Sequence, residues 1–176
     1  MTTAEKALSL AQAETLANQI RLNYWHRDRF PVDPVTIGTE LGIRIIDADL
    51  PEDVAGAFLK KVGGDPIIML HEFDPLNRKR FTCAHELGHY VYRLERGHFD
   101  EQEIDHVDKR SELSSTGKCP EEISASRFAA ALLMPVEKIH ALLKDSDDIY
   151  ALANFFKVSV SAMRYRLDSL GLLNND

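Results

Sequence analysis

His85-Glu86-Leu87-Gly88-His89 is the stretch that says most about the fold and chemistry of this chain. Residues four apart on an α-helix lie nearly above one another, so His85 and His89 can direct two imidazoles at one point. Glu86 lies beside them and can serve as a base next to an open coordination position of a metal. The pattern predicts the metal site of a zinc hydrolase, and the same donors also accommodate manganese or iron.

The residues around this stretch predict that it is helical. Apolar residues recur with helical spacing from Asn77 to Arg96, and Gly97 is a typical C-terminal stop. Phe81, Ala84 and Leu87 would supply apolar contacts to the helix. The competing interpretation is a pair of surface histidines on an amphipathic helix, which would hold no metal.

A catalytic zinc needs a third protein ligand in addition to the two histidines. The metzincin arrangement requires glycine at position 92 and histidine at position 95, but the chain has Tyr92 and Glu95, so that class is excluded. We therefore expect a carboxylate from a later helix. Such a helix begins at Pro120, because proline suits a first turn and the acidic Glu121 and Glu122 suit a helix N-terminus.

The spacing on this later helix favours Glu122 over Glu121 as the ligand. Ser126 and Ala129 share the face of Glu122, and the small Ala125 and Ser126 would allow close approach of the metal helix. For both glutamates, the alternative role is stabilisation of the helix dipole.

The rest of the chain predicts an α+β protein. Short β-branched runs separated by turn residues predict a small, mainly antiparallel sheet packed on helices. We expect a core at residues 1–135 and a C-terminal helical segment at 136–176, with helix-turn-helix proportions, packed on that core. The expected strands are 43–46, 57–61 and 67–70, with a hairpin at Gly63-Gly64-Asp65, and the expected helices are 7–27, 35–41, 77–96, 120–134, 136–143, 148–156 and 161–170.

The stretch from His98 to Lys118 has little periodicity, and we expect it to be a loop. Acidic residues are frequent in its first half, and we interpret them as a solvated surface. They are Asp100, Glu101, Glu103, Asp105 and Asp108.

Composition indicates a cytoplasmic protein. Apolar residues make up 44% of the 176 residues, which is enough for a core without disulfides. There is no run of 18 apolar residues and no secretory signal at the N-terminus. Cys83 and Cys119 form no CxxC pair, which fits a reducing compartment. We expect Cys83 in the core and Cys119 in a loop, the alternative for Cys119 being a thiolate that blocks the metal.

The chain resembles the ImmA/IrrE family of metallopeptidases. Four stretches carry the likeness, and their joint order and spacing are more specific than the metal motif alone. They are Pro31-Val32-Asp33-Pro34 with Leu41-Gly42-Ile43, then Arg78-Lys79-Arg80-Phe81-Thr82, then Ala84 to His89, and finally Glu122-x-x-Ala125-x-x-Phe128-Ala129 leading to Leu132-Leu133-Met134-Pro135.

The resemblance implies a zincin-like metallopeptidase core made of a sheet, a metal helix and a ligand helix. It implies that His85 and His89 bind the metal, that Glu122 is the third ligand, and that Glu86 is the general base. It also implies a substrate, because such proteins resemble proteases that cleave or inactivate a helix-turn-helix repressor encoded beside them. We therefore expect a zinc-dependent endopeptidase that acts on a helix-turn-helix transcriptional repressor or an antitoxin-like partner.

The ligand helix departs from the family pattern at one position. The family commonly places Asn or Asp after the alanine of this helix, whereas this chain has Ser126. Ser126 lies four residues after Glu122, so its side chain should point toward the metal site. An amide or carboxylate there could orient a ligand imidazole, and serine is a shorter and weaker acceptor.

Peptide hydrolysis also requires a donor that stabilises the oxyanion. The chain offers several candidates, and the sequence does not select among them. They are Tyr90, Tyr92, His71, His98, His106 and Arg110.

Charge weighs against a nucleic-acid partner. The formal net charge is −7, and within residues 147–176 three basic residues stand against four aspartates. A DNA-binding surface is usually basic, so we expect a protein partner and neither a membrane nor a nucleic acid. The competing function is a weak or inactive metal-stabilised module that acts as a toxin or regulator by binding protein or, less readily, DNA. The intact Glu86 favours the enzyme.

Overall fold

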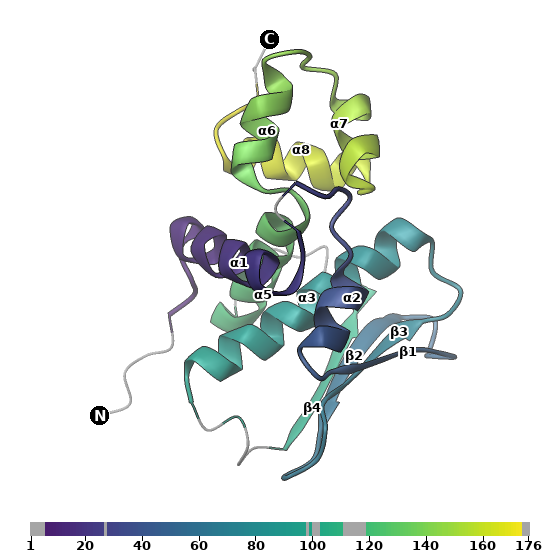
Figure 1. Cartoon of the computed structure of the whole chain (residues 1–176). Helices are drawn as coiled ribbons and strands as arrows, with labels where there is room; N and C mark the ends of the chain where they lie inside the picture. Colours follow the sequence, from purple (N-terminus) through teal and green to yellow (C-terminus); the bar gives the residue numbers. More distant parts are fainter. Residues whose placement is uncertain (1–5, 27, 98, 100–102, 111–118, 174–176) are drawn as a thin grey trace.

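A computed structural model describes residues 6–26, 28–97, 99, 103–110 and 119–173, and it has the α+β fold that the sequence predicts (Figure 1). The strands are β1 (Arg44–Ala48), β2 (Val54–Lys60), β3 (Ile67–His71) and β4 (Ile104–Lys109). The helices are α1 (Leu10–Tyr24), α2 (Pro34–Glu40), α3 (Leu76–Glu95), α5 (Pro120–Leu133), α6 (Val136–Leu143), α7 (Ile149–Phe156) and α8 (Val160–Ser169).

The sheet is mixed, with the strand order β1-β3-β2-β4. β1 and β3 run parallel, whereas β2 is antiparallel to both of its neighbours, β3 and β4. The predicted hairpin between β2 and β3 is confirmed, and Gly63 in its turn has a φ of +68°, which glycine adopts without strain. The mainly antiparallel sheet is therefore also confirmed, and β4 is one of its edge strands.

Local signals at the ends of α2 account for its boundaries. The carboxylate of Asp33 accepts a hydrogen bond from the Val35 amide at 3.2 Å, and Pro34 occupies the first turn. The helix is followed by Gly42, whose φ of +79° lies in the left-handed region. These residues start and stop α2 as the sequence predicts.

Helix α3 is the central element of the fold. It packs on β2 and β3 on one side and on α5 on another, and α1 in turn packs on α5. Glycine is required where α3 meets α5, because a Cβ at Gly88 would lie 2.7 Å from the Cα and the carbonyl oxygen of Ala125. The predicted close approach of the two helices at Ala125 is confirmed, and it brings the first turn of α5 beside the histidines of α3.

The sheet also reaches α3 through a glycine. A Cβ at Gly56 of β2 would lie 2.5 Å from Cγ2 of Thr82 and 3.3 Å from Oε1 of Glu86. Helix α3 is buried along much of its length, and Cys83 is in the core as predicted. The side chain of Glu86 is therefore enclosed between α3 and β2.

Strand β4 corrects the prediction of a loop from His98 to Lys118. Residues 104–109 pair antiparallel with β2, whereas 98, 100–102 and 111–118 lie outside the described residues. The alternation of the strand is present in the sequence, but its inward face carries His106 and Asp108 besides the apolar Ile104. A search for apolar periodicity passes over such a strand, because two of its three inward residues are polar.

The last three helices lie together at one end of the molecule, away from the sheet (Figure 1). Two buried arginines tie them to the rest of the chain. Arg166 of α8 donates hydrogen bonds to the Met134 carbonyl at 3.0 and 3.1 Å and pairs with Glu14 of α1. Arg80 of α3 donates to the Phe156 carbonyl at 3.4 Å. The division of the chain into a core at residues 1–135 and a C-terminal helical segment at 136–176 stays a prediction.

None of the helices in the described part of the chain combines the length and the apolar character that crossing a bilayer requires.

Candidate metal centre

Helix α3 presents two buried imidazoles to one point. His85 and His89 are 1% and 0% exposed, and their Nε2 atoms lie 3.2 Å apart. The two rings meet because residues four apart on a helix share a face. The structure thus brings the two predicted ligands together, with the same ring nitrogen of each facing the other.

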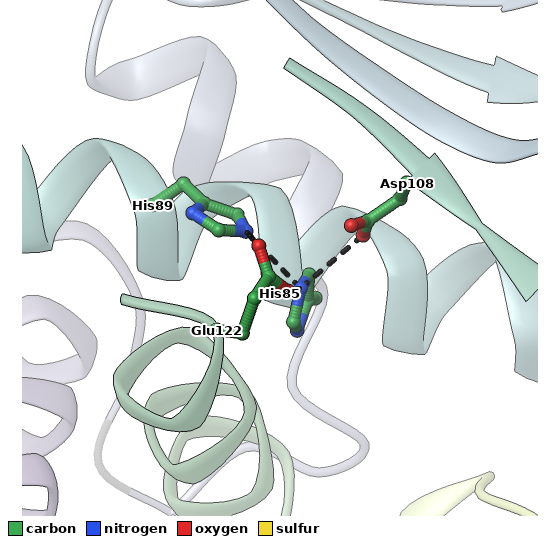
Figure 2. A group of neighbouring side chains, drawn as sticks. All are labelled: His85, His89, Asp108 and Glu122. Atoms are coloured by element: carbon green, nitrogen blue, oxygen red, sulfur yellow. Dashed lines mark hydrogen bonds and ion pairs between the residues drawn. The ribbon is translucent and has the colours of Figure 1, made fainter. Parts of the chain in front are cut away.

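Glu122 of α5 lies opposite both histidines (Figure 2). Its Oε2 lies 3.2 Å from Nε2 of His85, and its Oε1 lies 3.2 Å from Nε2 of His89. The contact of Gly88 with Ala125, one turn further along α5, holds the two helices at this separation. Glu122 therefore occupies the position that the sequence predicts for the third ligand.

Glu121 lies on the other side of His89 and acts there as its anchor. The Nδ1–H of His89 donates to Oε1 of Glu121 at 2.9 Å, and Nε of Arg93 donates to the same oxygen at 2.7 Å. Such a carboxylate fixes the ring orientation and leaves Nε2 free to bind a metal. The two adjacent glutamates thus have different contacts. Spacing in the sequence could only rank them as candidate ligands.

Ser126 contacts the other imidazole from α5. Its Oγ lies 3.3 Å from Nδ1 of His85, on the ring edge that faces away from Glu122. The side chain points toward the site, as predicted. A serine hydroxyl at this distance orients the ring through one weak contact, whereas His89 has a charged partner that is itself paired.

Asp108 of β4 is a residue that the sequence interpretation missed. We expected it in a solvated acidic loop, but it is 0% exposed, and its Oδ2 lies 3.2 Å from Nε2 of His85 (Figure 2). Its neighbour on the same strand face, His106, has its Nε2 3.1 Å from Oδ1 of Asp108 and 3.3 Å from Oε1 of Glu122. A His and an Asp two residues apart were the available signal, because such residues share one face of a strand.

Glu86 lies beside these groups as a buried carboxylate. It is 0% exposed, and neither of its carboxylate oxygens makes a hydrogen bond with the described residues. A buried carboxylate without a partner is costly, so such groups mark places where water, a proton or a cation completes the site. Glu86, His89, His106 and Asp108 place one ligand atom each within 4.8 Å of the others.

Carboxylates and imidazoles shift one another's ionisation in this cluster. Burial together with the negative charge of Asp108 raises the pKa of Glu86 well above its ordinary value. Burial on its own would lower the pKa of His85, but contacts with Asp108 and Glu122 outweigh it and raise that pKa to about 10. Burial opposes ionisation of Glu122 as well, yet its contacts with His85 and His89 hold its pKa below the ordinary value.

These residues fit a divalent cation. His85, His89, Asp108 and Glu122 each offer one ligand atom, and the four atoms lie within 4.8 Å of one another. Imidazole nitrogens and carboxylate oxygens are the donors of catalytic zinc sites, and a 2+ charge would balance the carboxylates gathered here. Cys119 belongs to neither group of metal-compatible side chains and is exposed at the start of α5.

Among the candidates for the oxyanion donor, His106 is in contact with Asp108 and Glu122 of this cluster. Arg110 pairs with Asp74 at 2.7 Å and lines a cavity next to the cluster, which is described below. The rings of three others have contacts of their own: Tyr90 meets Phe58 and Phe99 edge to face, Arg96 lies over the ring of Tyr92, and His71 contacts Phe73. His98 lies outside the described residues.

A cavity of about 1150 Å³ opens next to the cluster. Glu122 and Ser126 line it on the side of the metal-compatible residues, and Ala162 and Tyr165 line it on the side of α8. The cavity therefore connects the cluster with the C-terminal helices and gives a substrate room beside Glu122.

Comparison with known proteins identifies the family of the chain. No curated protein sequence matches the chain at a significant level. The family model described as Peptidase_M78, the IrrE N-terminal-like domain, matches residues 39–168, which include α3, β4 and α5. This match covers most of the chain and includes every residue of the cluster, so the chain belongs to the Peptidase_M78 (IrrE N-terminal-like) family.

Proposed function

We propose that this chain is a zinc-dependent endopeptidase. The observation that carries the proposal is the buried Glu86, whose two oxygens form no hydrogen bond of ordinary geometry with the residues that the structure describes, beside the cluster of His85, His89 and Glu122. A site with a purely structural metal has no use for such a carboxylate, whereas a hydrolase needs a base at this place. Membership of a peptidase family supports the same conclusion.

The residues divide the chemistry between them. His85, His89 and Glu122 would hold the metal, and a bound zinc supplies a Lewis acid that polarises a peptide carbonyl and acidifies water. Glu86 accepts a proton from the attacking water and delivers it to the leaving amine. We assign the stabilisation of the oxyanion to His106, because its Nε2 faces the cluster from β4.

A polypeptide substrate suits the surroundings of the cluster. β4 is an edge strand, and such a strand can pair with an extended peptide through its unpaired backbone groups. The cavity beside Glu122 provides space for side chains of that peptide. A helix-turn-helix repressor or an antitoxin-like partner is the substrate that the resemblance to the ImmA/IrrE family suggests, and we propose it on that ground.

A cytoplasmic location belongs to the same proposal. Cys83 and Cys119 are both free thiols, which suits a reducing compartment. The competing function, a metal-stabilised toxin or regulator without catalysis, would not depend on the carboxylate of Glu86. Arg166, one of the few basic residues of the tail, is buried and hence turned away from any nucleic acid.

Replacement of Glu86 by Gln separates the enzyme from the competing function. The substrate to test is a helix-turn-helix protein encoded beside this chain, with cleavage followed by intact-mass spectrometry and zinc by elemental analysis. Wild type should hold about one zinc per chain and cleave the protein. Glu86→Gln should keep the zinc and cleave roughly 100-fold more slowly or worse, since general-base catalysis contributes about 10²–10⁴-fold.

The matched control is Glu95→Gln, the same chemical change at an exposed position of α3. It should retain both zinc and cleavage. Cleavage by Glu86→Gln at the wild-type rate would overturn the assignment of the base. Wild type that contains no metal after purification without chelators would overturn the zinc-dependent mechanism.

A further inference from the structure

Strand β4 directs a fourth donor at the proposed metal position. Asp108 has no exposed surface, and its Oδ2 lies 3.2 Å from Nε2 of His85, as an ion-pair contact without the geometry of a hydrogen bond. A buried carboxylate oxygen and a ring nitrogen meet in this way either as an ion pair with a protonated imidazole or as two donors that face a cation between them. Ligand atoms around a shared ion lie close together without a hydrogen bond between them, since each points at the ion rather than at its neighbour.

The distances around Nε2 of His85 are close to those between the ligand atoms of a zinc site. Ligand atoms in a tetrahedral zinc site with bonds of about 2.0–2.2 Å lie about 3.3–3.6 Å from one another. Nε2 of His85 has three neighbours at 3.2 Å, slightly closer than these distances, namely Nε2 of His89, an oxygen of Glu122 and Oδ2 of Asp108. All four ligand atoms lie within 4.8 Å of one another, so one ion can be in reach of each.

We propose that Asp108 is a fourth protein ligand, which closes the metal centre in its resting state and leaves when a substrate binds. The proposal rests on the metal centre proposed above. A catalytic zinc keeps one position open, whereas four protein ligands make a closed site. Asp108 therefore occupies the position that a substrate or water needs for reaction.

The structure also provides a place for the carboxylate once it has left the metal. Oδ1 of Asp108 lies 3.1 Å from Nε2 of His106, which is partly exposed on the same face of β4. Asp108 can keep this contact while Oδ2 leaves the metal. β4 has a single neighbouring strand among the described residues, β2, so a shift of β4 breaks fewer contacts than a shift of α3.

Cobalt(II) is the probe for this inference, because its visible absorption reports coordination number without any need for a substrate. The protein is loaded with one cobalt ion, and the spectra and metal affinities of wild type, Asp108→Asn and Asp108→Ala are compared. Asp105→Asn is the matched control, since Asp105 is exposed on the opposite face of the same strand. Acetohydroxamate, a small bidentate metal ligand, then reports how accessible the open positions are.

Wild type should show the intense absorption of a four-coordinate site and bind acetohydroxamate weakly. Loss of an outer partner of a ligand lowers metal affinity about 10–100-fold, so loss of a direct ligand in Asp108→Ala should lower it by more than about 100-fold. Its cobalt spectrum should change in shape and intensity, and acetohydroxamate should bind more tightly than to wild type, because no carboxylate has to be displaced. Asp108→Asn, which keeps the shape of the side chain, should shift all three readouts in the same direction.

The outcomes separate this inference from the proposed function. If Asp108→Asn and Asp108→Ala match Asp105→Asn in spectrum, metal affinity and acetohydroxamate binding, Asp108 is not a ligand, and the centre with three protein ligands stands. Lower metal affinity with an unchanged spectrum would also overturn the inference, because it would make Asp108 only a positioning residue for His85 or His106. Wild type that binds neither cobalt nor zinc would overturn the metal centre itself.

Discussion

Helix α3 and strand β4 both supply side chains to the cluster, but the two elements are held very differently. α3 lies between the sheet and α5, and its side chains from Thr82 to His89 are all buried. β4 is an edge strand on which buried or partly buried positions alternate with exposed ones. Donors on the helix are therefore fixed by packing on several sides, whereas donors on the strand depend on one neighbouring strand and on the cluster itself.

The outer contacts of the donors come from different elements. His89 is anchored through Glu121 and Arg93, and His85 is in contact with Ser126; these three partners are partly exposed residues of α3 and α5. Asp108 has His106 as its second contact, and His106, also partly exposed, lies on the edge strand itself. In the metal centre proposed above, the helices would therefore determine where the metal lies, and the strand would determine whether a coordination position is open.

The largest effect is expected from removal of a helix donor. His89→Ala should lower the zinc content from about one ion per chain to near zero, because a site with two remaining helix-borne donors binds zinc poorly. Elemental analysis after dialysis measures this. His140→Ala, at an exposed position of α6, is the control and should keep its zinc.

Asp108→Asn should lose less zinc than His89→Ala in the same measurement. Equal loss in both variants would break the comparison between helix and strand, since the strand donor would then determine the metal position as strongly as the helix does.

The next largest effect is expected at the contact between the two helices. In Gly88→Ala the new methyl group would lie 2.7 Å from backbone atoms of Ala125, so α5 must move away from α3. Overpacking of this kind lowers the free energy of unfolding by roughly 1–3 kcal/mol. For a chain of this length, each kcal/mol lowers the midpoint temperature of unfolding by about 2–4 °C, so thermal unfolding followed by circular dichroism should resolve the change.

Gly64→Ala is the control for this variant. A Cβ at Gly64 meets its nearest neighbour, the Lys61 carbonyl oxygen, at 3.4 Å, which is ordinary contact. If Gly88→Ala unfolds at the same temperature as Gly64→Ala and retains its zinc, the separation of α3 and α5 is not critical for the centre.

The smallest effect is expected from loosening one anchored ring. Glu121→Gln keeps an acceptor for Nδ1–H of His89 but removes the charge that pairs with Arg93. Zinc affinity should fall by roughly tenfold, the lower end of what loss of an outer partner costs. Competition with a chromophoric chelator measures this, with Glu137→Gln, exposed on α6, as the control. An unchanged affinity would mean that packing alone orients His89.

Much of the fold was predictable because its elements carry local signals. The helix with His85 and His89 has apolar periodicity and a glycine stop, and the helix at Pro120 has proline and acids at its start. The observed elements are α3 (Leu76–Glu95) and α5 (Pro120–Leu133), as predicted within a residue or two. Such signals act over one or two turns, so they can be recognised without knowledge of the rest of the chain.

Strand β4 was not predictable in the same way. Its inward positions hold His106 and Asp108 because they face the cluster rather than the core, so apolar alternation is absent. Spacing alone could likewise only rank Glu121 and Glu122, because both can reach a neighbouring helix. The packing of α3 on α5 places Glu122 against Nε2 of both histidines and Glu121 against Nδ1 of His89.

By itself, the sequence determined that two imidazoles and a carboxylate base share one helix and that a second helix brings acids toward them. This follows from helical geometry, which relates residues three and four apart wherever the helix lies. Only the tertiary structure decided which glutamate faces the histidines, and that an aspartate from an edge strand joins them. These contacts join residues distant in sequence, and they depend on two glycines: Gly88 lets the backbones of α3 and α5 approach, and Gly56 makes room for the side chains of Thr82 and Glu86 against the sheet.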